Sequence, residues 1–90
     1  MKKTHYLLYC QALHRYVTLL SVTGNHSIKD IHEMVKPAGL AYGTKLEVVP
    51  INSMELAMYV WLKQHHYPDH GVPADELEIE DKRPVLRLVA

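Results

Sequence analysis

The sequence predicts a small α+β domain, built as a two-layer sandwich with two helices on one face of a mixed sheet of four or five strands. Its 90 residues are a usual length for one domain, and the hydrophobic fraction of 48% is enough for a packed core. Segments of strand-like and helix-like patterning follow one another in the order β-β-α-β-α-(β)-β. We find no repeat, linker or low-complexity tract, so we expect a single domain over residues 1–90.

Two strands are predicted at the N-terminus. Residues 4–10 (THYLLYC) and 16–23 (YVTLLSVT) are rich in aromatic and β-branched side chains, which favour extended structure. The short polar segment 11–15 joins them.

A helix is predicted next, because Ser27 is a good N-cap and Asp30 is placed as its capping-box partner. Its apolar face consists of Ile28, Ile31 and Val35. We expect Pro37 and Gly39 to end this helix.

The third strand and a second helix follow. In residues 44–51 (TKLEVVPI), apolar Leu46 and Val48 alternate with charged side chains, which is typical of a strand with one buried face. Asn52 or Ser53 caps the second helix, with Glu55 as the capping-box partner if Asn52 is the cap. The helix should run to about His66, because the residue before Pro68 avoids helical angles.

The C-terminal part is less regular. Residues 77–80 (LEIE) and 84–89 (PVLRLV) alternate with period two, which favours a closing hairpin around Asp81-Lys82. Residues 74–80 fit a strand or a short helical turn. Strands joined through a helix usually lie parallel with right-handed crossovers, so we expect both helices on the same face of a mixed sheet.

The second helix carries apolar side chains around most of its circumference. One stripe is wide enough to cover the sheet, which predicts a largely buried Trp61; it contains Met54, Ala57, Met58, Trp61 and Leu62. Leu56, Tyr59 and Val60 lie outside this stripe. This second flank packs either against the first helix or against another protein.

The histidine-rich segment 64–71 (QHHYPDHG) is the most suggestive chemical feature. His66 and His70 have the spacing of a zinc pair, and His66, Asp69 and His70 are the ligands of a hypothetical metal-dependent enzyme. Pro68 breaks the helix that this spacing requires. We therefore interpret the cluster as a helix end and predict no bound metal and no cofactor.

Other catalytic patterns are absent from the sequence. Cys10 and His14 would straddle a turn without an orienting acid or a glycine-rich oxyanion loop, so Cys10 is expected to be a small buried residue. The glycines form no phosphate-binding loop. We predict a non-enzymatic protein, and the single cysteine and short apolar runs favour a cytoplasmic protein without membrane attachment.

Charge and tyrosine content bear on partners. Ten Lys and Arg balance ten Asp and Glu, which makes nucleic acid an unfavoured partner. The alternative function is binding of single-stranded nucleic acid through tyrosines on an exposed sheet; its residues would be Tyr6, Tyr9 and Tyr16 with Lys2, Lys3 and Arg15.

The leading hypothesis is a protein-binding module that acts by occluding a surface of another protein or complex, with self-association as a further option. Six Tyr, one Trp and no Phe suit such an interface. The expected contacts are Leu56, Tyr59 and Val60 on the second helix and Tyr42 in the loop before the third strand. In size and organisation the chain resembles small inhibitors encoded by phages or mobile elements, including anti-CRISPR proteins, but it shares no motif with them.

Overall fold

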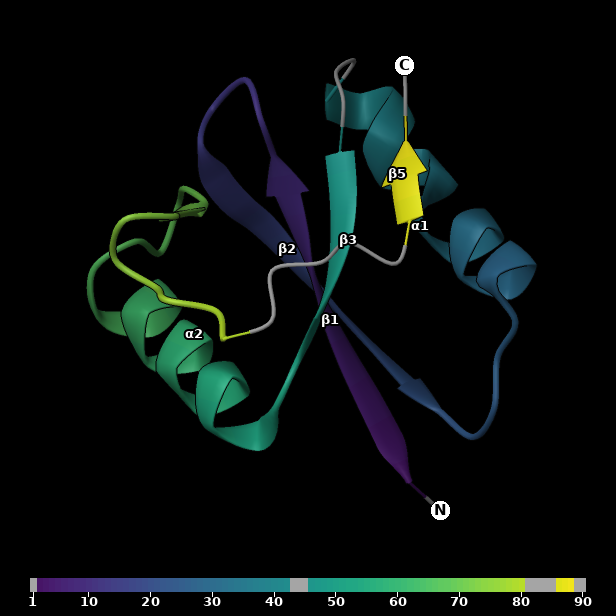
Figure 1. Cartoon of the computed structure of the whole chain (residues 1–90). Helices are drawn as coiled ribbons and strands as arrows, with labels where there is room; N and C mark the ends of the chain where they lie inside the picture. Colours follow the sequence, from purple (N-terminus) through teal and green to yellow (C-terminus); the bar gives the residue numbers. More distant parts are fainter. Residues whose placement is uncertain (1, 43–45, 81–85, 89–90) are drawn as a thin grey trace.

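The computed structural model describes residues 2–42, 46–80 and 86–88 and confirms the α+β class (Figure 1). Its elements are β1 (Lys3–Cys10), β2 (Arg15–Thr23), α1 (Ile28–Tyr42), β3 (Leu46–Ile51), α2 (Ser53–His65), β4 (Val72–Pro73) and β5 (Leu86–Leu88). The order of strands and helices is the expected one, but the strand before β5 lies at Val72–Pro73 and not at 77–80. The described strands form one sheet in the order β4-β2-β1-β3-β5. The N-terminal strand β1 is therefore the centre of the sheet.

The sheet is antiparallel, and the prediction of a mixed sheet is wrong. Each pair of neighbouring strands in the described chain is antiparallel. The expectation of parallel neighbours assumed that strands joined through a helix lie side by side. Instead β1 lies between β2 and β3, so these two strands run parallel to each other without pairing.

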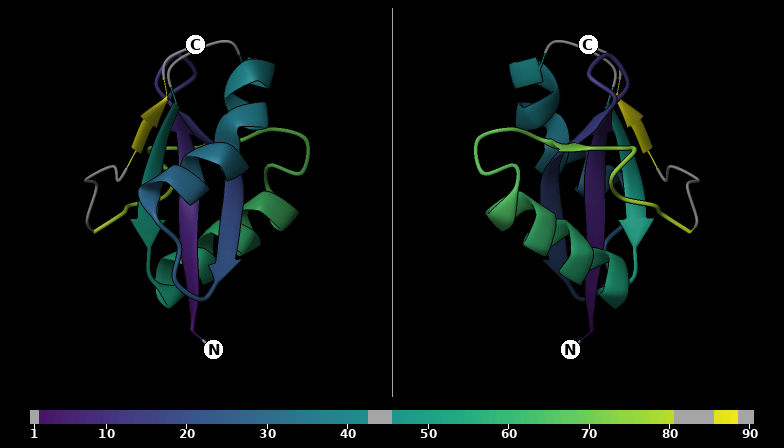
Figure 2. Two further views of the ribbon diagram at one scale, coloured as in Figure 1. Left: turned by 90° about the vertical axis from the view of Figure 1, so that its right-hand side faces the viewer. Right: turned by 90° about the vertical axis from the view of Figure 1, so that its left-hand side faces the viewer.

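The two helices cover opposite faces of the sheet, which corrects the prediction that both lie on one face (Figure 2). The reason is visible in β1 and β3. Leu7 and Val49 pack on the α2 side, whereas their chain neighbours Leu8 and Val48 pack on the α1 side. Because consecutive side chains in a strand point to opposite faces, these adjacent apolar residues need cover on both faces.

The hydrophobic core is consequently split in two. The α1-side core contains the buried residues Leu8, Cys10, Val17, Ile31, Val35, Leu46 and Val48. The α2-side core contains the buried residues Leu7, Tyr16, Val49, Tyr59, Leu62, Val72, Leu77 and Ile79. Cys10 is a buried free cysteine, in agreement with its expected packing role.

Helix α1 begins as predicted but ends later. The backbone N–H of Asp30 donates to Ser27 Oγ at 3.2 Å and that of Ser27 to Asp30 Oδ2 at 3.3 Å. Pro37 lies inside the helix rather than at its end, and the ribbon changes direction along α1 (Figure 2). Val35 before the proline and Ala38 after it both pack on the α1-side core. This packing on both sides offsets the lost hydrogen bond.

Helix α2 has the predicted capping box, with Asn52 as the N-cap. The Asn52 side chain accepts from the backbone N–H of Glu55 at 2.8 Å. The buried Glu55 carboxylate accepts from the backbone N–H of Asn52 at 2.9 Å and, through its other oxygen, from that of Glu80 at 2.7 Å. One carboxylate thus joins the start of α2 to the C-terminal segment.

Residues 74–80 do not form the strand considered for them. They begin with a turn in which Glu76 N–H donates to the Pro73 carbonyl at 3.0 Å, and Leu77 and Ile79 then point into the α2-side core. The predicted hairpin around Asp81-Lys82 lies outside the described residues, and β5 pairs with β3.

We predict that Glu55→Gln destabilises the fold by about 1–3 kcal/mol, because an amide has one acceptor oxygen where two backbone N–H groups need partners. Urea denaturation followed by circular dichroism measures the change. Glu80→Ala is the control: it removes an exposed side chain and keeps the backbone N–H, so a shift of no more than about 0.5 kcal/mol is expected. Equal destabilisation by the two variants would contradict the role assigned to Glu55.

Candidate functional site

Two features of the described structure are candidate binding sites: the outer surface of α2 and a polar pocket beside the β1–β2 turn. The first depends on how α2 is rotated. Glu55, Tyr59 and Leu62 face the sheet, since positions four and three residues apart lie on one side of a helix. Three large apolar side chains that point outward, Met54, Met58 and Trp61, form what we call the α2 outer face.

This rotation contradicts the prediction that the stripe containing Trp61 covers the sheet. Trp61 is 52% exposed, and of the predicted stripe Leu62 alone is buried. A charged residue such as Glu55 is usually exposed. Its carboxylate is buried through two backbone hydrogen bonds, and Tyr59 follows it one turn later on the same side. The capping box predicts one backbone partner for this carboxylate, but the second partner, the N–H of Glu80, carries no local signal.

The α2 outer face borders an open groove of about 330 Å³. Its lining residues are Met54, Ala57, Met58, Trp61, Leu62 and Glu76. The Trp61 ring stacks on that of His65 with 4.9 Å between centroids, and the His66 ring lies 5.1 Å away. The groove is thus mainly apolar, with one carboxylate at its border.

The four residues predicted to bind a protein do not share one exposed surface in the structure. Val60 is exposed and Leu56 is half-buried. Tyr59 lies in the α2-side core, which removes it from the surface. Tyr42 is the last residue of α1 rather than part of a loop, and its side chain is outside the described part of the structure.

The histidine-rich segment does not form a metal site in the described structure. The His66 ring packs between those of Trp61 and Tyr67, with centroid distances of 5.1 and 6.3 Å. Asp69 and His70 are exposed, and the His70 carbonyl accepts from Lys63 Nζ at 2.6 Å. Among the described residues, no three His, Cys, Asp or Glu side chains converge as metal ligands.

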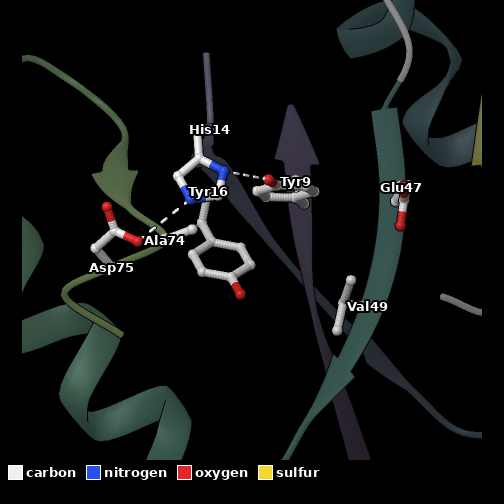
Figure 3. A pocket seen from close by; sticks show the side chains of 7 residues that line it. All are labelled: Tyr9, His14, Tyr16, Glu47, Val49, Ala74 and Asp75. Atoms are coloured by element: carbon white, nitrogen blue, oxygen red, sulfur yellow. Dashed lines mark hydrogen bonds and ion pairs between the residues drawn. The ribbon is translucent and has the colours of Figure 1, made fainter. Parts of the chain in front are cut away.

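The second place is a cavity of about 320 Å³, which we call the hairpin pocket (Figure 3). Its lining residues are Tyr9, His14, Tyr16, Glu47, Val49, Ala74 and Asp75. Three strands contribute to it because Tyr9 of β1 is paired with Tyr16 of β2 and with Glu47 of β3. The His14 carbonyl accepts from Ala74 N–H at 3.0 Å, which holds the turn after β4 against the hairpin.

A chain of polar contacts crosses one wall of the pocket. The Tyr9 hydroxyl oxygen lies 2.7 Å from His14 Nδ1, and His14 Nε2 lies 3.3 Å from Asp75 Oδ1 (Figure 3). The rings of Tyr9 and Tyr16 are 5.4 Å apart. Glu47 of β3 lies on the other side of β1 from His14 and Tyr16, and it accepts a hydrogen bond from the Gln11 side-chain amide.

Sequence reasoning missed this pocket. The sequence paired His14 with Cys10 and suggested Tyr9 and Tyr16 as surface tyrosines. Which side chains lie beside these residues depends on the register of the strands. The register between β1 and β3 is not encoded in local patterns. Asp75 carried no signal at all.

Burial raises the pKa of Tyr16 above its ordinary value of 10.0, and the negative charges of Tyr9 and Glu55 add to this. The pKa of Tyr9 is also raised, first by burial, then by the negative charges of Glu47 and Asp75 and by Cys10. Both phenols therefore stay protonated to a higher pH than a tyrosine in water does.

The tyrosines do not form the stacking platform that nucleic-acid binding would need. Tyr6 packs on the α1-side core, whereas Tyr9 and Tyr16 lie on the α2 side. A platform requires several rings on one exposed face of a sheet. In this fold the tyrosines are divided between two faces, each with a helix packed on it.

Comparison with known proteins gave no relatives: no protein-family model, no curated protein and no solved structure matches the chain. Neither described helix is long and apolar enough to cross a membrane.

The rotation of α2 predicts opposite outcomes for two neighbouring residues. Leu62→Ala should lower the free energy of unfolding by about 2–5 kcal/mol, as expected for a buried leucine. Trp61→Ala should lower it by about 1 kcal/mol or less, because half of the side chain is already in water. Circular dichroism in urea measures both without using tryptophan fluorescence. A larger loss for Trp61→Ala than for Leu62→Ala would show that the helix is rotated as the sequence first suggested.

The raised pKa values of Tyr9 and Tyr16 predict a loss of stability in alkali. A phenol with a folded-state pKa above 10.0 contributes stability that is fully present below pH 10.0 and is lost as pH rises through the folded value. Tyrosinate absorbance should show that Tyr9 and Tyr16 ionise above their ordinary value of 10.0. Tyr16→Phe should remove one late phase and reduce the pH dependence of unfolding; an unchanged alkaline titration in Tyr16→Phe would be inconsistent with this pocket.

Proposed function

We propose that this protein is a non-enzymatic binding module whose α2 outer face takes up an amphipathic segment of another protein. The exposure of Met54, Met58 and Trp61 side by side along an open groove is the observation that supports it. Large apolar side chains are scattered on most surfaces, but a contiguous group of them commonly marks a binding site.

The residue types suit such a role. Tryptophan is enriched among the residues that dominate binding energy at interfaces, and methionine adapts its shape to different partners. Trp61 is held by stacking on His65, so little side-chain freedom is lost when a partner covers it.

Charge indicates the chemistry of the occupant. Glu76 lines the groove, and Glu78 and Glu80 are exposed further along the same segment. The Lys63 ammonium group donates to the His70 carbonyl at 2.6 Å instead of facing these carboxylates. The complementary partner is therefore a segment with apolar anchors flanked by Lys or Arg, which acidic groups at the rim orient.

A module of this kind acts by occupying its partner's surface. Blocking of that partner is the simplest consequence, and it is the inhibitor role suggested by the size and organisation of the chain.

The test compares two methionines of nearly equal exposure on different helices. Met58 on α2 is 45% exposed and Met34 on α1 is 42% exposed. Proteins that co-purify with the tagged wild-type chain should be identified, and the affinity of the purified partner measured. Met58→Glu should weaken binding at least thirtyfold, about 2 kcal/mol, as expected for a central interface residue, whereas Met34→Glu should leave it unchanged.

Glu76→Lys adds a test of the occupant's charge. It should weaken binding and reduce its dependence on salt, because an attraction across the rim becomes a repulsion. Equal loss with Met34→Glu and Met58→Glu would place the interface elsewhere. If the outer face instead bound a second copy, Met58→Glu would convert a dimer into a monomer in sedimentation experiments, and the proposal of a foreign partner would be wrong.

A further inference from the structure

We propose that the hairpin pocket binds the primary ammonium group of a small amine, with a short apolar body against its aromatic wall. The site is separate from the α2 outer face, and the inference does not depend on the proposed function.

The pocket carries negative charge. Glu47 is only 9% exposed, and Asp75 lies on the opposite side of the cavity. Among the side chains that the structure describes, no Lys or Arg lines the cavity. Arg15 is the next cation along β2, but its guanidinium donates to the Gly71 carbonyl at 2.7 Å and lies over the Tyr67 ring at 5.9 Å.

Glu47 retains capacity to accept a hydrogen bond. The Gln11 amide donates to Oε1, and within the described structure no donor reaches Oε2. Burying a carboxylate with few partners is costly, and an ammonium ion supplies both an opposite charge and several N–H donors.

The aromatic residues add a second basis for cation binding. Tyr16 is 5% exposed, and no described residue forms a hydrogen bond with its hydroxyl group, although this side chain lines the cavity. Figure 3 shows its ring between Asp75 on one side and Val49 on the other. Tyrosine faces attract cations, and a free hydroxyl oxygen can accept from an ammonium N–H. The Tyr9 ring, 5.4 Å away, widens this wall.

A metal ion fits the site less well than an organic cation. Among the described lining residues His14 is the one nitrogen ligand, and its two ring nitrogens already contact Tyr9 and Asp75. No set of three metal-ligating side chains converges within the described chain. The pocket therefore offers two separated carboxylates and π faces, which suit a monovalent, partly apolar cation.

The size of the cavity limits the ligand. A volume of about 320 Å³ is at the lower end of the range for ligand pockets. Val49 and Ala74 provide apolar wall beside the tyrosines. A short arylalkyl amine and the side chain of a lysine share the required chemistry.

Titration followed by NMR, with free phenethylamine and with Nα-acetyl-lysinamide, tests both sources of that group. We expect saturable shifts at Glu47 and Tyr16; tighter binding of the free amine indicates a small molecule, and tighter binding of the lysine derivative indicates a protein side chain. 3-Phenylpropionate keeps the aromatic body and reverses the charge, so it should not bind. Binding of the acid as tightly as the amine would overturn the proposal.

Charge variants locate the interaction. Glu47→Gln should weaken amine binding at least tenfold, whereas Glu33→Gln, the same change at an exposed position of α1, should not alter it. Tyr16→Phe should weaken amine binding about threefold while the fold is retained. If Glu47→Gln fails to fold, the result for Tyr16→Phe tests whether the amine binds in the hairpin pocket. Arg87 of β5 is paired with Glu47 of β3. Arg87→Gln should leave amine binding unchanged or tighter, and loss of binding in this variant, or equal effects of Glu47→Gln and Glu33→Gln, would contradict the proposal.

Discussion

The Glu55 carboxylate determines much of this structure. It accepts one backbone N–H at the start of α2 and another from Glu80, twenty-five residues along the chain. A carboxylate that satisfies two backbone donors is stable in a buried position. Because it points inward, α2 is rotated so that Tyr59 and Leu62 reach the sheet and Trp61 remains in water. The surface proposed to bind a partner is a consequence of this one buried acid.

The central position of β1 has a second consequence. With partners on both edges and a helix over each face, its side chains belong alternately to two cores. Near the end of β1, Tyr9 lies beside Tyr16 of β2 on one edge and beside Glu47 of β3 on the other. Short cores on two faces bury less apolar area each than a single large one, so hydrogen bonds at the sheet ends matter more to a domain of this size.

The two candidate sites share the turn that follows β4. Ala74 and Asp75 line the hairpin pocket, and the next residue, Glu76, lines the groove beside α2. The turn is held on one side by the His14 carbonyl and closed by the hydrogen bond from Glu76 to Pro73. Both sites thus draw a carboxylate from one short segment, which gives each of them a negative rim and favours cationic groups in their ligands.

The sequence by itself determined the two helices with their N-caps and the strands β1, β2 and β3, because these depend on hydrogen bonds and periodicities among close neighbours, as with Ser27 and Asn52. It did not determine which faces meet. Helix α2 is apolar on two sides, so its periodicity fits two rotations, and only the distant N–H of Glu80 selects between them. The position of β1 between β2 and β3 is likewise determined by long-range pairing. The helices on opposite faces, the exposed Trp61 and the hairpin pocket all follow from contacts that no local pattern records.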